Sequence, residues 1–293
     1  MPERVEWALV VHEHDTIGEG PVWDAPRASL LWTDIGGRRI HRLDPATGAV
    51  WTRGLEQMAG AVLPRASGGL ALCLQDGVYL TDTDEGEPRL LVAVEPDDEV
   101  TRLNDVKTDR TGRLWGGTMA FDARPDAGAF YRIEPDGTIA TIASPTSISN
   151  GIEWSLDGSL MYYIDTATGR MDVFDFDLAA GSALNRRPFI VFDESFGIPD
   201  GMTIDAEGCP WVAFYDGWAV RRFTPSGALD RTIELPTART TSCAFGGPDL
   251  DHLFVTSARD GLSEAELAEQ PHAGALFVIE PGVTGLPITP FAG

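Results

Sequence analysis

The sequence predicts an all-β protein, and three observations support this prediction. Short runs rich in Val, Ile, Leu, Trp, Tyr and Phe recur along the chain, each about as long as one strand, as in 30–35, 160–164 and 211–215. Turn sequences such as Pro135-Asp136-Gly137 separate these runs. Only residues 262–270 have the pattern of a helix, and they are long enough for one or two turns.

A strand-turn-strand pattern is repeated six times along the chain. Its clearest copies begin with Asn150-Gly-Ile-Glu-Trp and with Asp200-Gly-Met-Thr-Ile. The copies begin at positions 19, 61, 104, 150, 200 and 242, which are 42, 43, 46, 50 and 42 residues apart. A period of roughly 40–50 residues is typical of the blades of a β-propeller.

We therefore predict a single domain, residues 1–293, folded as a six-bladed β-propeller with four antiparallel strands per blade. Each blade takes about 49 residues, and the ring needs all six to bury the blade faces. Residues 6–11 are expected to add an outer strand to the last blade and so close the ring. Five tryptophans in the repeats are expected to pack between blades, namely Trp23, Trp32, Trp115, Trp154 and Trp211.

Charge and composition exclude several classes of function. The 45 acidic residues exceed the 22 basic ones, which gives a net charge of −23. This balance argues against nucleic-acid binding and against docking on anionic lipid. The N-terminal residues do not have the pattern of a signal peptide, and three scattered cysteines indicate reduced thiols, so we expect a cytoplasmic protein.

The first residue of each repeat is the expected functional position, because the first strand of each propeller blade lines the central channel. Four of these six residues carry carboxylate or amide oxygens, namely Glu19, Asn104, Asn150 and Asp200. Such oxygens are the preferred ligands of Ca²⁺, Mg²⁺ and Mn²⁺, and two carboxylates balance a dication. Asn-Gly and Asp-Gly also form ordinary turns, but their position at the start of a repeat favours an axial metal site.

The same residues resemble the gluconolactonase family, which includes regucalcin, the senescence marker protein. The resemblance extends through essentially the whole chain and is strongest in Gly18–Trp23, Arg102–Asp105, Gly117–Met119, Ser149–Gly151, Pro199–Gly201 and Cys243–Gly247. It implies a six-bladed propeller that holds one divalent cation on its axis and hydrolyses sugar-acid lactones. It implies Ca²⁺ first, with Mg²⁺, Mn²⁺, Zn²⁺ or Fe²⁺ as alternatives.

The resemblance also implies a role for individual residues. Glu19, Asn150 and Asp200 match the metal ligands of the family. Arg102 matches a residue that binds sugar hydroxyls, and Asn104 matches an amide that contacts substrate close to the metal. Asp122 stands in Met119-Ala120-Phe121-Asp122, where the family has a longer acidic substrate contact.

The expected reaction is hydrolysis of a sugar lactone whose carbonyl is polarised by the axial cation, with Asp200 orienting or deprotonating the attacking water. The expected partner is this small molecule, and the expected state is a monomer or weak homo-oligomer. Two alternatives stay open. One is hydrolysis of phosphotriesters at the same site, and the other is a calcium-binding propeller without turnover.

Other motifs favour structural roles. The segment 82–87 imitates the start of an EF-hand loop but has Gly86 in place of the third ligand, so a solvated hairpin is expected. His12 and His14 are expected at the surface, and His41 is expected to be structural.

Overall fold

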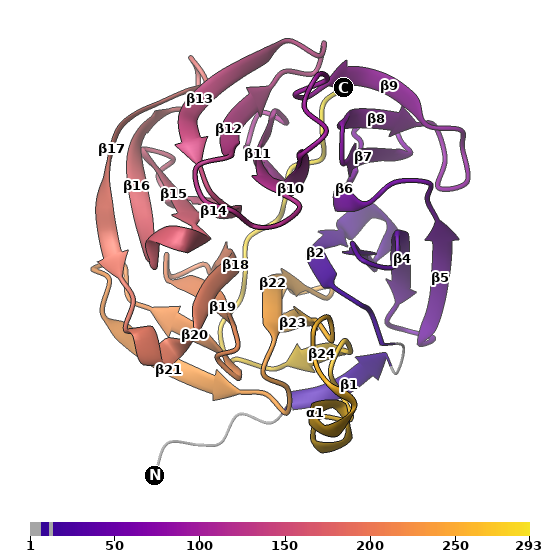
Figure 1. Ribbon diagram of the computed structural model, residues 1–293, viewed down its shortest axis with the longest axis vertical. Helices are drawn as coiled ribbons and strands as arrows, with labels where there is room; N and C mark the ends of the chain where they lie inside the picture. The colour runs from indigo at the N-terminus through magenta and orange to yellow at the C-terminus, as the bar shows by residue number, and fades with distance from the viewer. Residues whose placement is uncertain (1–6, 12–13) are drawn as a thin grey trace.

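Six four-stranded antiparallel sheets surround a central channel in the computed structural model, which describes residues 7–11 and 14–293 (Figure 1). The predicted all-β, six-bladed propeller is therefore confirmed. From the channel outwards, the first three blades contain β2(Gly18–Asp24), β3(Ser29–Asp34), β4(Arg39–Asp44) and β5(Ala49–Gly54); β6(Ala59–Pro64), β7(Leu70–Leu74), β8(Gly77–Thr81) and β9(Arg89–Ala93); and β10(Thr101–Thr108), β11(Leu114–Ala120), β12(Gly128–Ile133) and β13(Ile139–Thr146).

The next two blades repeat this order and the sixth closes the ring. They contain β14(Ser149–Trp154), β15(Leu160–Asp165), β16(Arg170–Asp177) and β17(Ser182–Val191); and β18(Ile198–Ile204), β19(Pro210–Tyr215), β20(Ala219–Phe223) and β21(Leu229–Glu234). The sixth combines β22(Thr240–Gly246), β23(His252–Ser257) and β24(Leu276–Ile279) with β1(Trp7–Val11) as its outer strand. The predicted closure is confirmed for residues 7–11, while residue 6 lies outside the described part of the chain.

The predicted helical segment forms α1(Glu264–Glu269) on the rim of the ring (Figure 1). Ser263 caps its N-terminus by accepting a hydrogen bond from the Glu266 amide, and the Glu266 carboxylate accepts one from the Ser263 amide. No helix in the described ranges is long and apolar enough to cross a membrane.

An Asp-x-x-Gly-x-x-Trp pattern explains how two blades hold their inner hairpins. Asp109 accepts a hydrogen bond from the Trp115 indole at 2.9 Å, and Asp205 accepts the matching bond from Trp211, also at 2.9 Å. Each carboxylate also accepts amide hydrogen bonds from its own turn, which joins turn and strand in one network.

All five predicted core tryptophans are at most 6 % exposed. Trp115 of the third blade packs edge-on against Phe176 of the fourth.

Every innermost strand has a break in register against its neighbour, close to the end where the strand begins. The break follows Glu19, Ala59, Leu103, Asn150, Pro199 and Thr240. Such bulges bend a strand and redirect its side chains. They place Ala59 and Thr240, rather than Ala61 and Ser242, level with the polar first residues of the other blades. The repeat alignment was therefore wrong by two residues in the second and sixth blades, which have no polar-Gly pair to fix it.

The C-terminal segment after β24 crosses the far end of the channel. In Figure 1 its yellow trace passes behind the centre of the ring, from the sixth blade toward the second and third. Thr284 O accepts a hydrogen bond from the Ala206 amide at 2.8 Å, and the Phe291 amide donates to Pro64 O at 2.9 Å. Phe291 is fully buried, so this segment belongs to the core of the protein.

Candidate functional site

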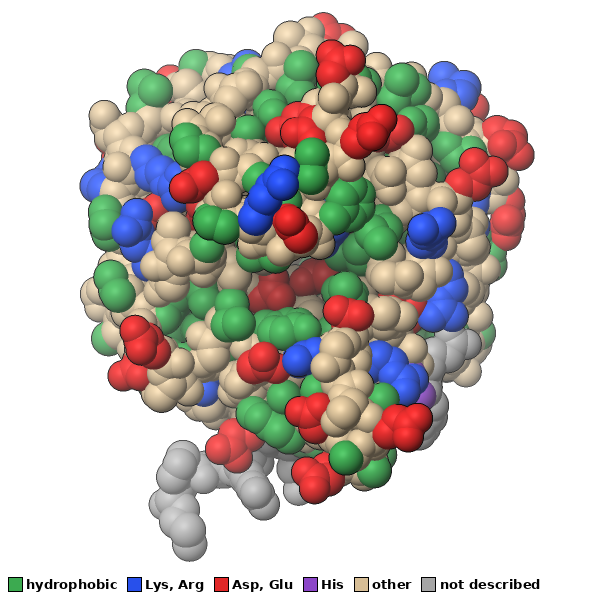
Figure 2. Space-filling view, viewed as in Figure 1, with side chains coloured by type: hydrophobic (Ala, Val, Ile, Leu, Met, Phe, Trp, Pro, Cys, Tyr) green, Lys and Arg blue, Asp and Glu red, His purple; other side chains and the backbone are tan. Residues whose placement is uncertain are grey.

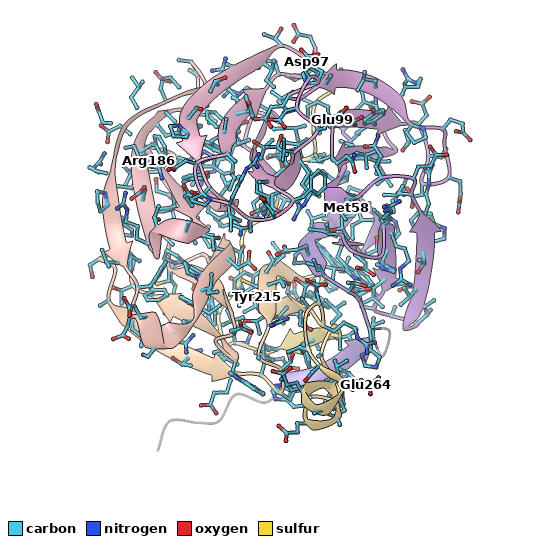
Figure 3. All side chains as sticks on the ribbon, viewed as in Figure 1. Met58, Asp97, Glu99, Arg186, Tyr215 and Glu264 are labelled. Carbon is cyan, nitrogen blue, oxygen red and sulfur yellow. The ribbon has the colours of Figure 1, made fainter. Side chains whose placement is uncertain are left out.

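The channel opens on the face where the innermost strands begin. Figure 2 shows a depression at the centre of this face, with acidic side chains at its base and hydrophobic side chains around its rim. Figure 3 places Met58 and Tyr215 close to this opening, whereas Asp97, Arg186 and Glu264 lie farther out in the ring. The opening is therefore a concave, partly apolar entrance to a buried polar layer, as is usual for a small-molecule site.

The three predicted metal ligands stand at the register breaks of three different blades. Glu19 lies on β2, Asn150 on β14 and Asp200 on β18, and their exposed fractions are 7 %, 4 % and 8 %. Glycine follows each of them, and close packing requires it at two of these positions. A Cβ on Gly201 would lie 2.2 Å from Ser242 Oγ, and one on Gly151 would lie 2.9 Å from Asp200 O.

Burial and neighbouring negative charges make ionisation of Glu19 and Asp200 unfavourable. Burial, followed by the charge of Asp105, raises the pKa of Glu19 to about 8. Burial, followed by the charge of Glu19, raises the pKa of Asp200 well above its usual range. Buried carboxyl groups with raised pKa values are groups whose ionised form a bound cation can stabilise.

Asn150 is oriented with its amide oxygen toward the channel. Its Nδ2 donates to Thr166 Oγ1 at 2.8 Å, and Thr166 Oγ1 in turn donates to Pro199 O at 2.9 Å. The amide nitrogen of Asn150 is thus bound to Thr166, and its Oδ1 accepts a hydrogen bond from Asn104 Nδ2. An amide oxygen together with two carboxylates is a donor set that suits a hard cation such as Ca²⁺.

Arg102 and Asn104 form a buried pair next to this set. Arg102 Nη1 donates to Asn104 Oδ1 at 2.7 Å, and Asn104 Nδ2 donates to Asn150 Oδ1 at 3.0 Å. Because Asn104 Oδ1 already accepts a hydrogen bond from Arg102, Asn104 lies next to the three proposed ligands and is not counted among them. Burial lowers the pKa of Arg102 to about 10, while the charges of Glu19 and Asp200 oppose this shift.

Asp122 differs from the other predicted site residues because it is exposed. Its carboxylate lies 4.0 Å from Arg124 Nε, and its side chain is 63 % exposed. It belongs to the loop between β11 and β12, at the face where the channel opens, and the neighbouring Phe121 is 45 % exposed. No hydrogen bond or ion pair among the described residues joins Asp122 to the buried set.

A second group of potential ligands lies outside the channel. Asp15, Asp34 and His41 are buried, and their ligand atoms lie within 4.8 Å of one another. Asp15 Oδ2 accepts a hydrogen bond from Trp32 at 2.8 Å, and His41 stacks on the same ring. Asp34 accepts from two backbone amides and from Arg39, which is why its pKa is lowered despite burial. These bonds give the group a structural role, as expected for His41.

The remaining histidine predictions concern the N-terminal segment. His14 is exposed as predicted, and its Nδ1 lies 3.1 Å from Ala273 O. His12 lies outside the described residues.

The structure also brings two residues into the channel that sequence reasoning missed, Asp105 and Lys107. Asp105 occupies the position that is Gly20, Gly151 and Gly201 in three other blades. It is 5 % exposed, and burial raises its pKa. Two features of the sequence could have indicated these residues. Asp105 replaces the glycine of the other repeats, and Lys107 is the only lysine of the chain.

Comparison with known proteins agrees with this fold. The model of the SMP-30/Gluconolactonase/LRE-like region matches residues 17–259. Regucalcin from Xenopus laevis is 39 % identical over 291 residues, which is 97 % of each chain. YvrE from Bacillus subtilis, whose assigned function is that of a sugar lactone lactonase, is 37 % identical over 287 residues and covers 97 % of this chain and 98 % of its own.

A solved structure extends this similarity to three dimensions. The calcium-binding protein regucalcin from Agrobacterium tumefaciens superimposes with a TM-score of 0.95 at 30 % identity, covering 99 % of this chain and 98 % of its own. The chain belongs to the SMP-30/gluconolactonase/LRE-like family. This family includes sugar lactonases and regucalcins, so it supports lactone hydrolysis as a general activity.

Proposed function

We propose that this protein hydrolyses a sugar-acid lactone to the aldonic acid and depends on one divalent cation held by Glu19, Asn150 and Asp200. The observation that supports this most is the burial of Glu19 and Asp200 in the channel, which raises the pKa of both carboxyl groups, with the charge of Glu19 adding to the shift of Asp200. Such a pair is costly to the folded protein unless a cation balances it. Family membership supports the lactonase class, and the regucalcin relatives support Ca²⁺ as the first candidate.

A bound divalent cation would supply Lewis-acid polarisation of the lactone carbonyl. Asp200 then accepts a proton from water, whose oxygen forms the new bond to the carbonyl carbon. The ring C–O bond breaks, and the departing alkoxide takes the proton from Asp200 to become the hydroxyl of the open acid, which restores the Asp200 carboxylate. Arg102 holds Asn104 through the 2.7 Å hydrogen bond, so that the two together orient the sugar hydroxyls. Asp122 provides a further contact from the loop above the opening.

Charge and thiol chemistry support the cellular setting that we propose. Cys73, Cys209 and Cys243 are buried and free, which is in keeping with a cytoplasmic location. The net charge of −23 favours a small-molecule substrate over nucleic acid or anionic membrane. We include in the proposal a monomer or weak homo-oligomer, because all four strands of each blade are already paired within one chain.

The test is a proton-release assay on a panel of five- and six-membered aldonolactones, with and without a chelator. We expect hydrolysis of at least one lactone, abolished by chelation and restored by Ca²⁺, Mg²⁺, Mn²⁺, Zn²⁺ or Fe²⁺. Calcium binding without hydrolysis of any lactone would instead support a calcium-binding propeller without turnover; the Agrobacterium tumefaciens regucalcin is a calcium-binding protein.

A further inference from the structure

A second charged layer lies in the channel beneath the proposed metal ligands. Lys107, Glu153, Thr203 and Cys243 occupy the same position in four neighbouring blades, one residue past the register break. Lys107, Glu153 and Thr203 line a cavity of about 100 Å³, together with Leu286, Pro287 and Thr289 of the C-terminal segment. This layer is therefore enclosed by the segment that closes the far end of the channel.

Lys107 is the only lysine among 293 residues, since the other 21 of the 22 basic residues are arginine. Its Nζ lies 2.7 Å from Glu153 Oε1 and donates to Met202 O at 2.5 Å. One ammonium group thus connects the third, fourth and fifth blades across the channel. A lysine ammonium is a compact point charge with three donors, whereas an arginine guanidinium is a planar fork.

Asp105 leaves this layer incompletely paired. Its Oδ2 is buried and has no hydrogen-bond partner among the described residues. The charge of Lys107 opposes the effect of burial on Asp105 and also acts on Glu19 in the layer above. The ammonium therefore provides the positive charge that the lower carboxylates require.

Counting charges shows what this arrangement achieves. The two layers contain four carboxylates, Glu19, Asp105, Glu153 and Asp200, and two cationic side chains, Arg102 and Lys107. With all of them ionised, the channel has a net charge of −2, which one divalent cation neutralises. Without Lys107 the net charge is −3, and Asp105 and Glu153 become two uncompensated acceptors beside the cavity.

We propose that Lys107 takes the place of a second cation in the channel, and that it thereby restricts the protein to one bound divalent ion in the upper layer. This inference rests on the metal site of the proposed function. Lys107 is in this sense a positioning residue, because it acts through the lower carboxylates and does not touch the substrate.

The experiment measures calcium stoichiometry of the full chain by titration calorimetry and by elemental analysis after equilibrium dialysis. We expect one Ca²⁺ per chain in the wild type and in Lys107→Arg, which retains the charge. Lys107→Met should bind two, with the tighter ion bound about tenfold more tightly than in the wild type, because one nearby positive charge has been removed. Lys107→Gln, whose amide can still donate to Met202 O, provides the same test with less disturbance of the fold.

Further outcomes separate this inference from the proposed function. The double variant Lys107→Gln/Glu153→Gln removes the pair together, restores the net charge of −2, and should return to one ion. A single ion of unchanged affinity in both Lys107→Gln and Lys107→Met would overturn the role of Lys107. Absence of calcium binding by the wild type would instead contradict the metal site itself.

Discussion

The two ends of the channel are built from the same strands but differ in chemistry. At the open end, the register breaks direct Glu19, Asn150 and Asp200 toward the axis, and the carboxyl groups resist ionisation. At the closed end, Lys107 and Glu153 form a direct ion pair beneath which the C-terminal segment lies. The comparison shows that the closed end contains a direct ion pair within the chain, whereas no ion pair among the described residues joins Glu19 or Asp200 at the open end.

We expect the largest effect on activity from a substitution at the open end of the channel. Asp200→Asn keeps the shape of the side chain but removes one negative charge and the proton acceptor. We expect it to lower lactone hydrolysis on the order of a thousandfold, as removal of a central electrostatic group does, and to weaken calcium binding. Initial rates and calorimetry measure both. Asp136→Asn is the matched control, because Asp136 lies on an exposed turn, and full activity in Asp200→Asn would refute the assignment.

Breaking the closed end should affect folding more than chemistry. Phe291→Ala removes a fully buried ring that anchors the C-terminal segment against the core. We expect a loss of about 3 kcal/mol in the free energy of unfolding. The kcat of the folded variant should stay close to that of the wild type. Urea unfolding and lactone kinetics on the same preparation separate the two. An unchanged midpoint would show that the segment does not stabilise the ring.

The pH dependence of the metal-free protein sharpens the contrast. Because the pKa of Glu19 is raised from 4.5 to about 8, the folded protein retains a proton that the unfolded chain has released. Stability should therefore fall as pH rises from about 4.5 to 8, and calcium should remove most of this loss. Thermal unfolding with and without a chelator tests this. Glu19→Gln, which cannot ionise, should flatten the profile, and an equally steep profile in that variant would assign the effect to other groups.

The smallest expected effect concerns the loop above the opening. Asp122 is exposed and is not joined to the buried set, so Asp122→Asn should raise KM by about threefold or less, the effect of a weak surface charge contact. The kcat should stay the same. Steady-state kinetics on the preferred lactone give both constants. A large fall in kcat would show that this loop closes over the substrate and brings Asp122 to the reacting bond.

Much of the fold was readable in the sequence because the propeller is repetitive. Asn150-Gly151 and Asp200-Gly201 marked equivalent strands, and their polar residues led directly to the candidate ligands. The copies at 61 and 242 were misaligned by two residues, because their first strands are apolar or hydroxyl-rich and no charged residue fixes the register.

The structure of the closed end of the channel could not be predicted from the sequence, because its contacts join residues far apart along the chain. Residues 284–292 have no strand periodicity, and they pair with carbonyls and amides far away in the sequence, such as Pro64 and Ala206. Lys107 and Glu153 are 46 positions apart. Their pairing depends on a register that only the folded sheets define. Sequence repetition therefore predicts the ring, whereas the ion pair inside it can be identified only in the folded structure.

The most direct test of the central claim is a titration of Ca²⁺ into metal-free protein, with bound ion and the initial rate of lactone hydrolysis measured on the same samples. We predict that the rate rises in proportion to bound ion and saturates at one ion per chain. Hydrolysis at full rate before any ion is bound, or none when one ion per chain is bound, would contradict a metal-dependent lactonase site at Glu19, Asn150 and Asp200.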